Sequence, residues 1–170
     1  MNIIKFKNKI PSINETSRLF LNSCLIGDVR VGEEVSIWFG SILRGDIYPI
    51  IIGSRSNIRD FCLLHGSNGI IKIGDGVSIG QRSVLDSCVI EDSCIIGANC
   101  IIMDGVVVGE NSIVLPNSLL LKNRKFPPFS LVHGSPARVV RPLIKSELEK
   151  IKEESNFYVD LKNSYSKVCI

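Results

Sequence analysis

Residues 73–120 read IGDGVSIGQRSVLDSCVIEDSCIIGANCIIMDGVVVGENSIVLPNSLL, and an aliphatic residue recurs there every six positions, with one five-residue step. A six-residue period fits neither an amphipathic helix nor an alternating strand. Earlier parts of the chain repeat the pattern. The aliphatic positions are Val31, Ile37, Leu43, Ile52, Ile58, Leu64, Ile73, Ile79, Leu85, Ile90, Ile96, Ile102, Val108, Val114 and Leu120.

A second inward position lies four residues after each aliphatic one and holds a small or β-branched residue. Three six-residue repeats then form one triangular coil of 18 residues, and successive coils stack as parallel strands about 4.8 Å apart. The pattern therefore predicts an all-β fold, a β-helix prism. The second positions are Val35, Ser41, Ile47, Ser56, Cys62, Val77, Ser83, Val89, Cys94, Cys100, Val106, Ser112 and Ser118.

The breaks in the period predict where the chain leaves the prism. The steps from Leu43 to Ile52 and from Leu64 to Ile73 are nine residues long, so extra residues bulge from one corner in successive coils, at 46–51 and 66–69. The step from Leu85 to Ile90 is one residue short and tightens the next corner. Functional residues in solenoids favour such insertions.

Composition favours one prism domain over residues 1–143, followed by a helix within 144–170 that packs on it. The 170 residues are 45% hydrophobic with a net charge of +3, and show neither a membrane-spanning run nor a nucleic-acid footprint. Residues 1–9 read as an edge strand without a signal peptide, so we expect a cytoplasmic protein. Ser146 and Glu149 form an expected capping box, and the predicted apolar stripe of the helix is Leu148, Ile151, Tyr158, Leu161 and Tyr165.

The six cysteines are interpreted mainly as small buried residues. Cys62, Cys94 and Cys100 occupy the second inward position, and Cys24 does so if the period is extended back to Phe20. No CxxC motif occurs. Cys88 and Cys169 stay unassigned.

Because one coil is three repeats, the pattern also predicts which outward residues stack. One ladder is Arg44, His65, Asp86 and Met103, and a second, on the preceding wall, is Phe39, Asp60, Gln81 and Ala98. The simplest interpretation of Arg44 and Asp46 is an exposed ion pair, worth roughly 0–1 kcal/mol. For His65, a hydrogen bond to Asp86 and a role as a metal ligand both stay open, whereas His133 reads as a loop histidine.

Residues 35–143 resemble the gamma-class carbonic anhydrases of the hexapeptide-repeat superfamily. The motifs that carry the resemblance are Arg44-Gly45-Asp46, Asn57 to Asp60, Leu64-His65, Ile79-Gly80, Met103-Asp104-Gly105 and Gly134-Ser135-Pro136-Ala137. The resemblance implies a left-handed β-helix and a homotrimer with sites between subunits. It also implies roles in ordering the site and the interface for Arg44, Asp46, Asn57 and Asp60.

In that family three histidines, two from one subunit and one from its neighbour, hold zinc, whose bound water attacks carbon dioxide. The matching positions here are His65, Gln81 and Asp86, so two of the three ligands are replaced. Arg59 stands in place of a family glutamine that orients the zinc-bound water, and its charge opposes a divalent ion. Arg59 and Asp86 are expected to pair between subunits.

Three functional hypotheses follow. The first is a trimeric relative with little or no hydration of CO2 to bicarbonate and no stoichiometric zinc. The second is an active metalloenzyme that uses His65, Asp86, Gln81 and water. The third is an acyltransferase with His65 as general base, disfavoured because the chain lacks an extended acceptor-binding loop.

Overall fold

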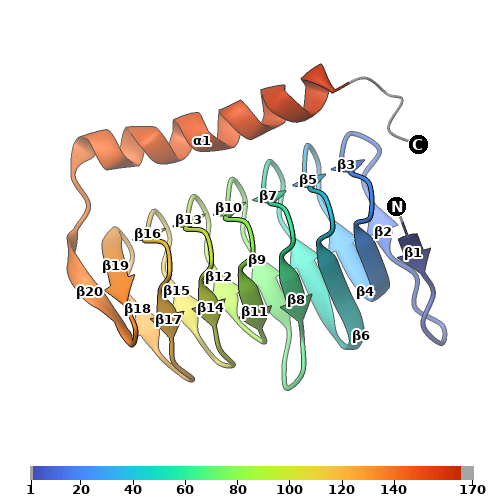
Figure 1. The fold of residues 1–170 in the computed structure, drawn as a ribbon, viewed down its shortest axis with the longest axis horizontal. Helices are drawn as coiled ribbons and strands as arrows, with labels where there is room; N and C mark the ends of the chain where they lie inside the picture. The colour runs from blue at the N-terminus through green and yellow to red at the C-terminus, as the bar shows by residue number, and fades with distance from the viewer. Residues whose placement is uncertain (1, 166–170) are drawn as a thin grey trace.

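The computed structural model describes residues 2–165, and their strands wind into a left-handed parallel β-helix of three walls (Figure 1). Met1 and Cys169 lie outside the described residues, as does the end of the segment 144–170. Parallel pairing joins each coil to the next, and the β19–β20 hairpin closes the far end with antiparallel pairing. The predicted fold class is therefore confirmed.

We call the walls A, B and C. Long strands β4 (Cys24–Val31) and β6 (Ile42–Ile52) cross from wall A to wall B. Wall A also contains β1 (Asn2–Ile4), β8 (Leu63–His65), β11 (Val84–Asp86), β14 (Ile101–Ile102) and β17 (Leu119–Leu120). Wall B also contains β2 (Ser12–Ile13), β9 (Ile71–Ile73), β12 (Val89–Ile90), β15 (Val107–Val108) and β18 (Lys125–Phe126). Wall C contains β3 (Arg18–Leu19), β5 (Ser36–Ile37), β7 (Asn57–Ile58), β10 (Ser78–Ile79), β13 (Ile95–Ile96), β16 (Ile113–Val114), β19 (Ser130–Gly134) and β20 (Ala137–Pro142).

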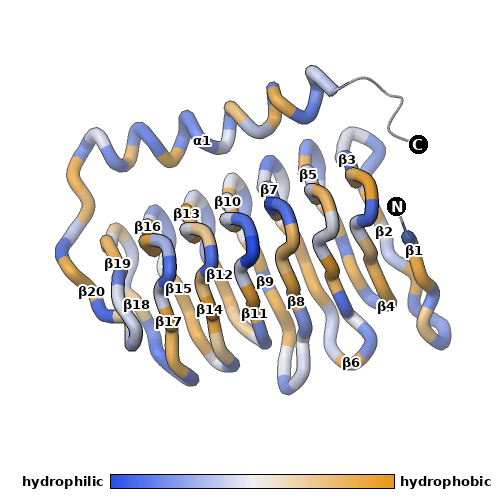
Figure 2. Tube along the Cα trace, in the orientation of Figure 1, coloured by the Kyte–Doolittle hydropathy of each residue, from blue (hydrophilic) through white to orange (hydrophobic). Residues whose placement is uncertain are grey.

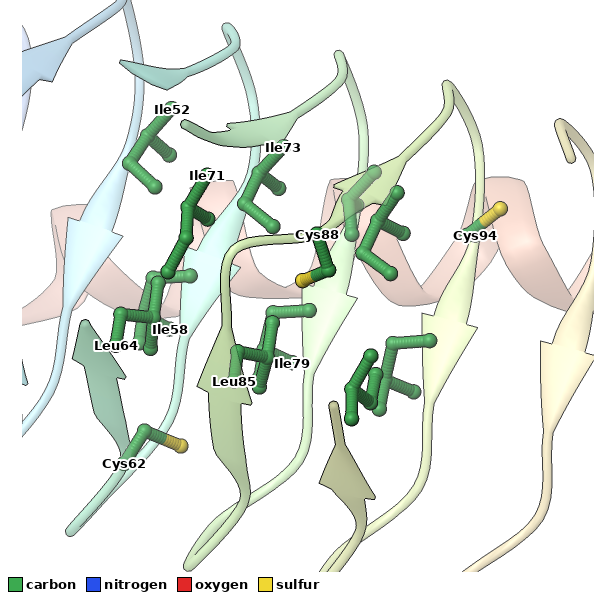
Figure 3. Packing of buried hydrophobic residues seen from close by; sticks show 14 of the residues in the cluster. Ile52, Ile58, Cys62, Leu64, Ile71, Ile73, Ile79, Leu85, Cys88 and Cys94 are labelled. Atoms are coloured by element: carbon green, nitrogen blue, oxygen red, sulfur yellow. The ribbon is translucent and has the colours of Figure 1, made fainter. Parts of the chain in front are cut away.

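The core is the stack of inward side chains from all three walls. Figure 3 shows Ile52 and Ile73 from wall B, Ile58 and Ile79 from wall C, and Leu64 and Leu85 from wall A stacked in successive coils. None of the six is more than 1% exposed. Burial of this kind stabilises by roughly 25 cal/mol per Å² of apolar surface, so the repeated aliphatic positions account for the prism.

Three of the predicted second inward positions are wrong, each by a shift of register. Ser23 is buried in place of Cys24, because Leu19, not Phe20, pairs with Ile37. Ile50 and Cys88 are buried in place of Ile47 and Val89. The strand pairing explains Ile50 and Cys88, because it restarts after each break. Ile50 is aligned with Ile71, and Val89 with Lys72 and Val107.

The buried cysteines behave as apolar residues. Burial raises the pKa of the Cys62 and Cys94 thiols to about 12, so both are protonated at neutral pH and are poor nucleophiles. Cys100 is equally buried, with its thiol pKa also raised by burial.

The helix α1 (Lys145–Ser164) runs along wall C, antiparallel to the direction of coil stacking (Figure 1). Ile151 packs with Ile113 and Leu131 at one end of the helix. At the other end Tyr158 contacts the ring of Trp38, with ring centroids 5.7 Å apart. Figure 2 shows hydrophobic residues recurring in every coil, whereas α1 mixes hydrophilic and hydrophobic residues.

The capping prediction is wrong in its residues. Ile144 is the N-cap, and the Glu147 carboxylate, not Glu149, accepts the N–H of Ile144 at 3.0 Å. Arg141 fixes that carboxylate with two bonds of 2.8 Å. The last residues of β20 therefore set the start of the helix. Within residues 2–165, no helix is long and apolar enough to cross a membrane.

Ile73 and Lys72 allow a direct test of the inward stacking, because they are adjacent on β9 and point to opposite faces. Ile73→Ala should lower the free energy of unfolding by about 2–5 kcal/mol, since it leaves a cavity between Ile52 and Ile90. Lys72→Ala should change it by no more than about 0.5 kcal/mol. Urea unfolding at one fixed protein concentration measures both, and equal effects would contradict the assignment.

Candidate functional site

The first predicted ladder lies on wall A, where the wall ends at its corner with wall B. Arg44 on β6 is aligned with His65 on β8, and His65 with Asp86 on β11. The register that stacks the aliphatic core therefore also places a cation, an imidazole and a carboxylate in one column. The chain leaves the prism beside this column at 46–49 and at 66–69. The predicted first excursion was two residues too long, because Ile50 and Ile51 pair with Val29 and Arg30.

Arg44 and Asp46 hold the imidazole of His65 from two sides. Nη2 of Arg44 lies 3.1 Å from Nδ1 and 2.9 Å from Nε2 of His65. Oδ1 of Asp46 lies 3.3 Å from the same Nε2, and Oδ2 lies 3.6 Å from Nε of Arg44. One atom this close to both ring nitrogens lies against the face of the imidazole, so Arg44 covers the ring rather than aligning with one lone pair.

The carboxylate of Asp86 is bonded to the 66–69 excursion. Oδ1 accepts the backbone N–H of Ser67 at 3.1 Å, and both oxygens lie 2.7 Å from the Ser67 hydroxyl. The Ser87 hydroxyl donates to Oδ1 at 2.7 Å. Burial acts to raise the pKa of Asp86, but the hydrogen bonds from Ser67 and Ser87 outweigh it and lower the pKa. Asp86 is therefore an ionised anchor of the excursion.

The Ser87 hydroxyl also anchors the excursion. It accepts the backbone N–H groups of Asn68 at 3.0 Å and of Gly69 at 3.1 Å. The sequence prediction did not include Ser67 or Ser87. A serine within a glycine-flanked insertion and another directly after a ladder carboxylate were the available signals, since such hydroxyls often bond nearby backbone.

The second ladder forms at the other edge of wall A, at its corner with wall C. Backbone bonds link its members coil by coil: Phe61 N–H to Phe39 O, Arg82 N–H to Asp60 O, Asn99 N–H to Gln81 O and Asn117 N–H to Ala98 O, all of 2.9–3.0 Å. Gln81 therefore lies across the width of the wall from His65 and Asp86. One copy of the chain brings together two of the three predicted ligand positions.

The side-chain oxygen of Gln81 is buried and has no hydrogen-bond partner within residues 2–165. The Oδ1 atom of Asn57, on wall C beneath α1, is in the same state, while the amide nitrogen of Asn57 donates to the Ser78 hydroxyl at 2.7 Å. Native structures satisfy most buried acceptors. Oε1 of Gln81 is therefore open to a donor such as water or a group of another copy.

Arg59 is turned toward the C-terminal helix. Its guanidinium lies 3.7 Å from the Glu154 carboxylate and 5.1 Å from the ring centroid of Tyr158. The sequence prediction did not include these partners, which are about a hundred residues away in the chain. Asp60 is partly buried beside it at the corner. Arg59 thus acts within its own chain as a contact between prism and helix.

Within residues 2–165, no three His, Cys, Asp or Glu side chains converge closely enough to hold a metal ion. The column offers His65 and Asp86 only, alongside the cation Arg44. A zinc site needs three or four protein ligands, so any such site in this fold requires residues of a second copy.

Residues 87–122 match the family model described as bacterial transferase hexapeptide (six repeats). Three curated relatives match over most of this chain. The probable carbonic anhydrase of Methanocaldococcus jannaschii is 48% identical over 88% of this chain and 94% of its own length. A carbonic anhydrase of Geobacillus kaustophilus is 37% identical over 97% and 91%. The mitochondrial gamma carbonic anhydrase 1 of Arabidopsis thaliana is 32% identical over 94% and 60%.

Solved structures of similar shape are described as transferases. A hexapeptide transferase family protein of Anaplasma phagocytophilum superposes with a TM-score of 0.92 at 31% identity, covering 96% of this chain and 98% of its own. A hexapeptide-repeat acetyltransferase of Vibrio cholerae, solved with acetyl coenzyme A, has a TM-score of 0.61 at 28% identity, covering 67% and 70%.

The prism, the Arg44, His65 and Asp86 column and the identity over nearly the whole chain lead to one assignment. This chain belongs to the gamma carbonic anhydrase-like family of hexapeptide-repeat proteins.

Proposed function

We propose that this chain is a homotrimeric gamma carbonic anhydrase-like protein whose sites between subunits do not take zinc and whose CO2 hydration is weak or absent. The proposal depends on one observation: the side chains at two family ligand positions, His65 and Asp86, already contact other side chains of the same chain. Nη2 of Arg44 lies within 3.1 Å of both ring nitrogens of His65. Asp86 is committed to Ser67 and Ser87.

The outer face of wall A supports the trimer. One aliphatic side chain per coil points outward there and is 38–48% exposed, at Ile42, Leu63, Val84 and Ile101. The four are aligned by the strand register. A contiguous apolar face of this kind is typical of an interface. Around a threefold axis parallel to the prism, wall A would face the axis and its two corners would meet the two neighbours.

The donor chemistry does not fit zinc. A neutral amide oxygen at Gln81 is a weak replacement for an imidazole. Asp86 would have to give up hydrogen bonds from Ser67 and Ser87 that hold the excursion. His65 would have to give up its present contacts with Arg44 and Asp46. We therefore assign these residues to charge pairing and to ordering the site, with Arg44, Asp46 and Asp60 at the interface.

We expect protein purified without chelator or affinity metal to contain less than about 0.1 zinc, iron or cobalt per subunit, because a stable site needs three or four ligands. Its CO2 hydration, followed by stopped flow, should match the buffer background. Elemental analysis of the trimer isolated by size exclusion measures the metal content per subunit. About one metal per subunit, with hydration abolished by His65→Ala, would instead establish the metalloenzyme.

Restoring imidazoles should create a zinc site. In an Arg59→Gln background, Gln81→His with Asp86→His should bind about one zinc per subunit, since three imidazoles would then meet between copies. The matched controls are the two single variants, each with only two imidazoles, which should bind no stoichiometric zinc. A double variant that stays a trimer and binds none would contradict the shared site.

Acyl transfer is the second candidate, favoured by the similarity to the acetyltransferase solved with acetyl coenzyme A. That chemistry would need His65 to accept a proton from an acceptor. Arg44 covers the imidazole and lies within 3.1 Å of both ring nitrogens, so it would have to move before an acceptor substrate could reach His65.

A thermal-shift titration with acetyl coenzyme A separates the two functions. We expect no change in Tm at millimolar ligand. A ligand at about 100 times its Kd would stabilise the protein by ~2.7 kcal/mol, which is readily measured. A saturable rise in Tm would favour acyl transfer over the carbonic anhydrase-like function.

A further inference from the structure

Phe61 combines a left-handed backbone with a highly exposed ring. It stands at the corner of walls C and A with φ of 58°, and at 68% it is the most exposed large hydrophobic side chain within residues 2–165. This left-handed conformation costs an L-residue roughly 1–2 kcal/mol, and asparagine tolerates it best. Asparagine does occupy five other such positions, Asn22, Asn99, Asn111, Asn117 and Asn123.

The fold makes room for this ring. A Cβ atom at Gly40, one coil earlier on the same corner, would lie only 2.6 Å from a ring carbon of Phe61. The backbone N–H of Phe61 donates to Phe39 O at 2.9 Å. The ring therefore rests on a glycine and projects from the corner in a fixed position. A strained, exposed and supported aromatic side chain indicates a functional role.

An apolar cavity lies at the opposite edge of wall A. It has a volume of about 510 Å³ and is bounded by Phe6, Lys7, Asn8, Lys9, Asp46 and Ile47. Ile47 is 57% exposed, and Tyr48 beside it is 42% exposed. The cavity thus lies between the turn near Phe6 and the 46–51 excursion. Asp46, which contacts His65, forms part of its wall.

The ring and Ile47, on one side of the cavity, lie at nearly the same height along the prism. Ile47 and Phe61 are separated by about two-thirds of a coil, so they differ in height by roughly 3 Å of the ~4.8 Å strand spacing. A threefold axis parallel to the prism brings together opposite corners of wall A from neighbouring copies at equal height. Within one copy, the width of wall A separates the ring from the cavity.

We propose that Phe61 of one copy inserts between Phe6 and Ile47 of the neighbouring copy. The occupant of the cavity is then a second copy of this chain, continuous with the aliphatic face of wall A. In that position the ring would cover the apolar side of Asp46 and shield the Asp46 and His65 contact from water. The proposal rests on the trimer proposed above and is independent of whether the site takes a metal.

The chain contains a matched control. Phe129 has the same φ of 58° and is 44% exposed, but it stands on another corner, where its N–H donates to Glu110 O. Phe61→Asn and Phe129→Asn relieve the same backbone strain. A role in folding alone would therefore affect both variants alike.

Sedimentation velocity over a range of concentrations tests the contact. Phe61→Asn should raise the concentration of half-dissociation of the trimer at least about tenfold, because a buried aromatic side chain is lost at every interface. Phe129→Asn should leave it unchanged. Equal dissociation of the two variants and the parent would overturn the proposal.

Cross-linking gives a direct answer. In a Cys24→Ser, Cys169→Ser background, Phe61→Cys with Ile47→Cys should form disulfides between copies on mild oxidation, whereas Phe129→Cys with Ile47→Cys should not. A trimer without cross-links would overturn the contact while leaving the trimer intact. A monomeric parent protein would overturn both this contact and the proposed assembly.

Discussion

The backbone hydrogen bonds between successive coils are the constraint on which the rest of this structure depends. Each coil must repeat the height and direction of the one before it, because its N–H and C=O groups have no other partners in a parallel stack. Inward side chains of the same type then stack on one another, as Ile58, Ile79 and Ile96 do on wall C. The same register stacks the outward residues. Arg44, His65 and Asp86 form a column because each directly follows one of the stacked leucines, Leu43, Leu64 and Leu85.

Insertions are the means by which such a regular structure acquires a site. Residues 46–49 and 66–69 have no partners in the strand register, so they leave the prism at one corner and need other support. Asp46 supports the first excursion by accepting the Ile47 N–H at 2.9 Å, and Asp86 and Ser87 support the second. Asp46 and Asp86 therefore have a structural role in addition to any chemistry.

The prism, the two excursions and both ladders could be predicted from the sequence because each follows from a period that the backbone enforces. The errors arose where that period restarts. Ile47 and Val89 were placed inward by counting across a break, and Cys24 by extending the period back to Phe20 instead of Leu19. The structure shifts the buried residue to Ile50, Cys88 and Ser23. Pairing register after an insertion depends on how the excursion closes, which no local pattern specifies.

Contacts between side chains of distant segments could also not be predicted from the sequence. Arg59 contacts Glu154 and Tyr158 only because α1 returns along wall C. That helix starts where the Glu147 carboxylate, held by Arg141, caps the Ile144 N–H, and not at the predicted pair Ser146 and Glu149. The place of Asp86 in the column could be predicted, but not its bonds to Ser67, since these depend on the path of the excursion.

The fates of the three replaced positions differ, and the difference is informative. Asp86 and Arg59 each have charged or hydrogen-bonded partners within their own chain. Gln81 has a buried side-chain oxygen without a donor within residues 2–165. A buried acceptor left unpaired costs about 1–3 kcal/mol, so a donor from water or from another copy would stabilise the fold. Gln81 lies at the edge of wall A, where the aliphatic face also lacks a cover, so a neighbouring copy would satisfy both requirements at once.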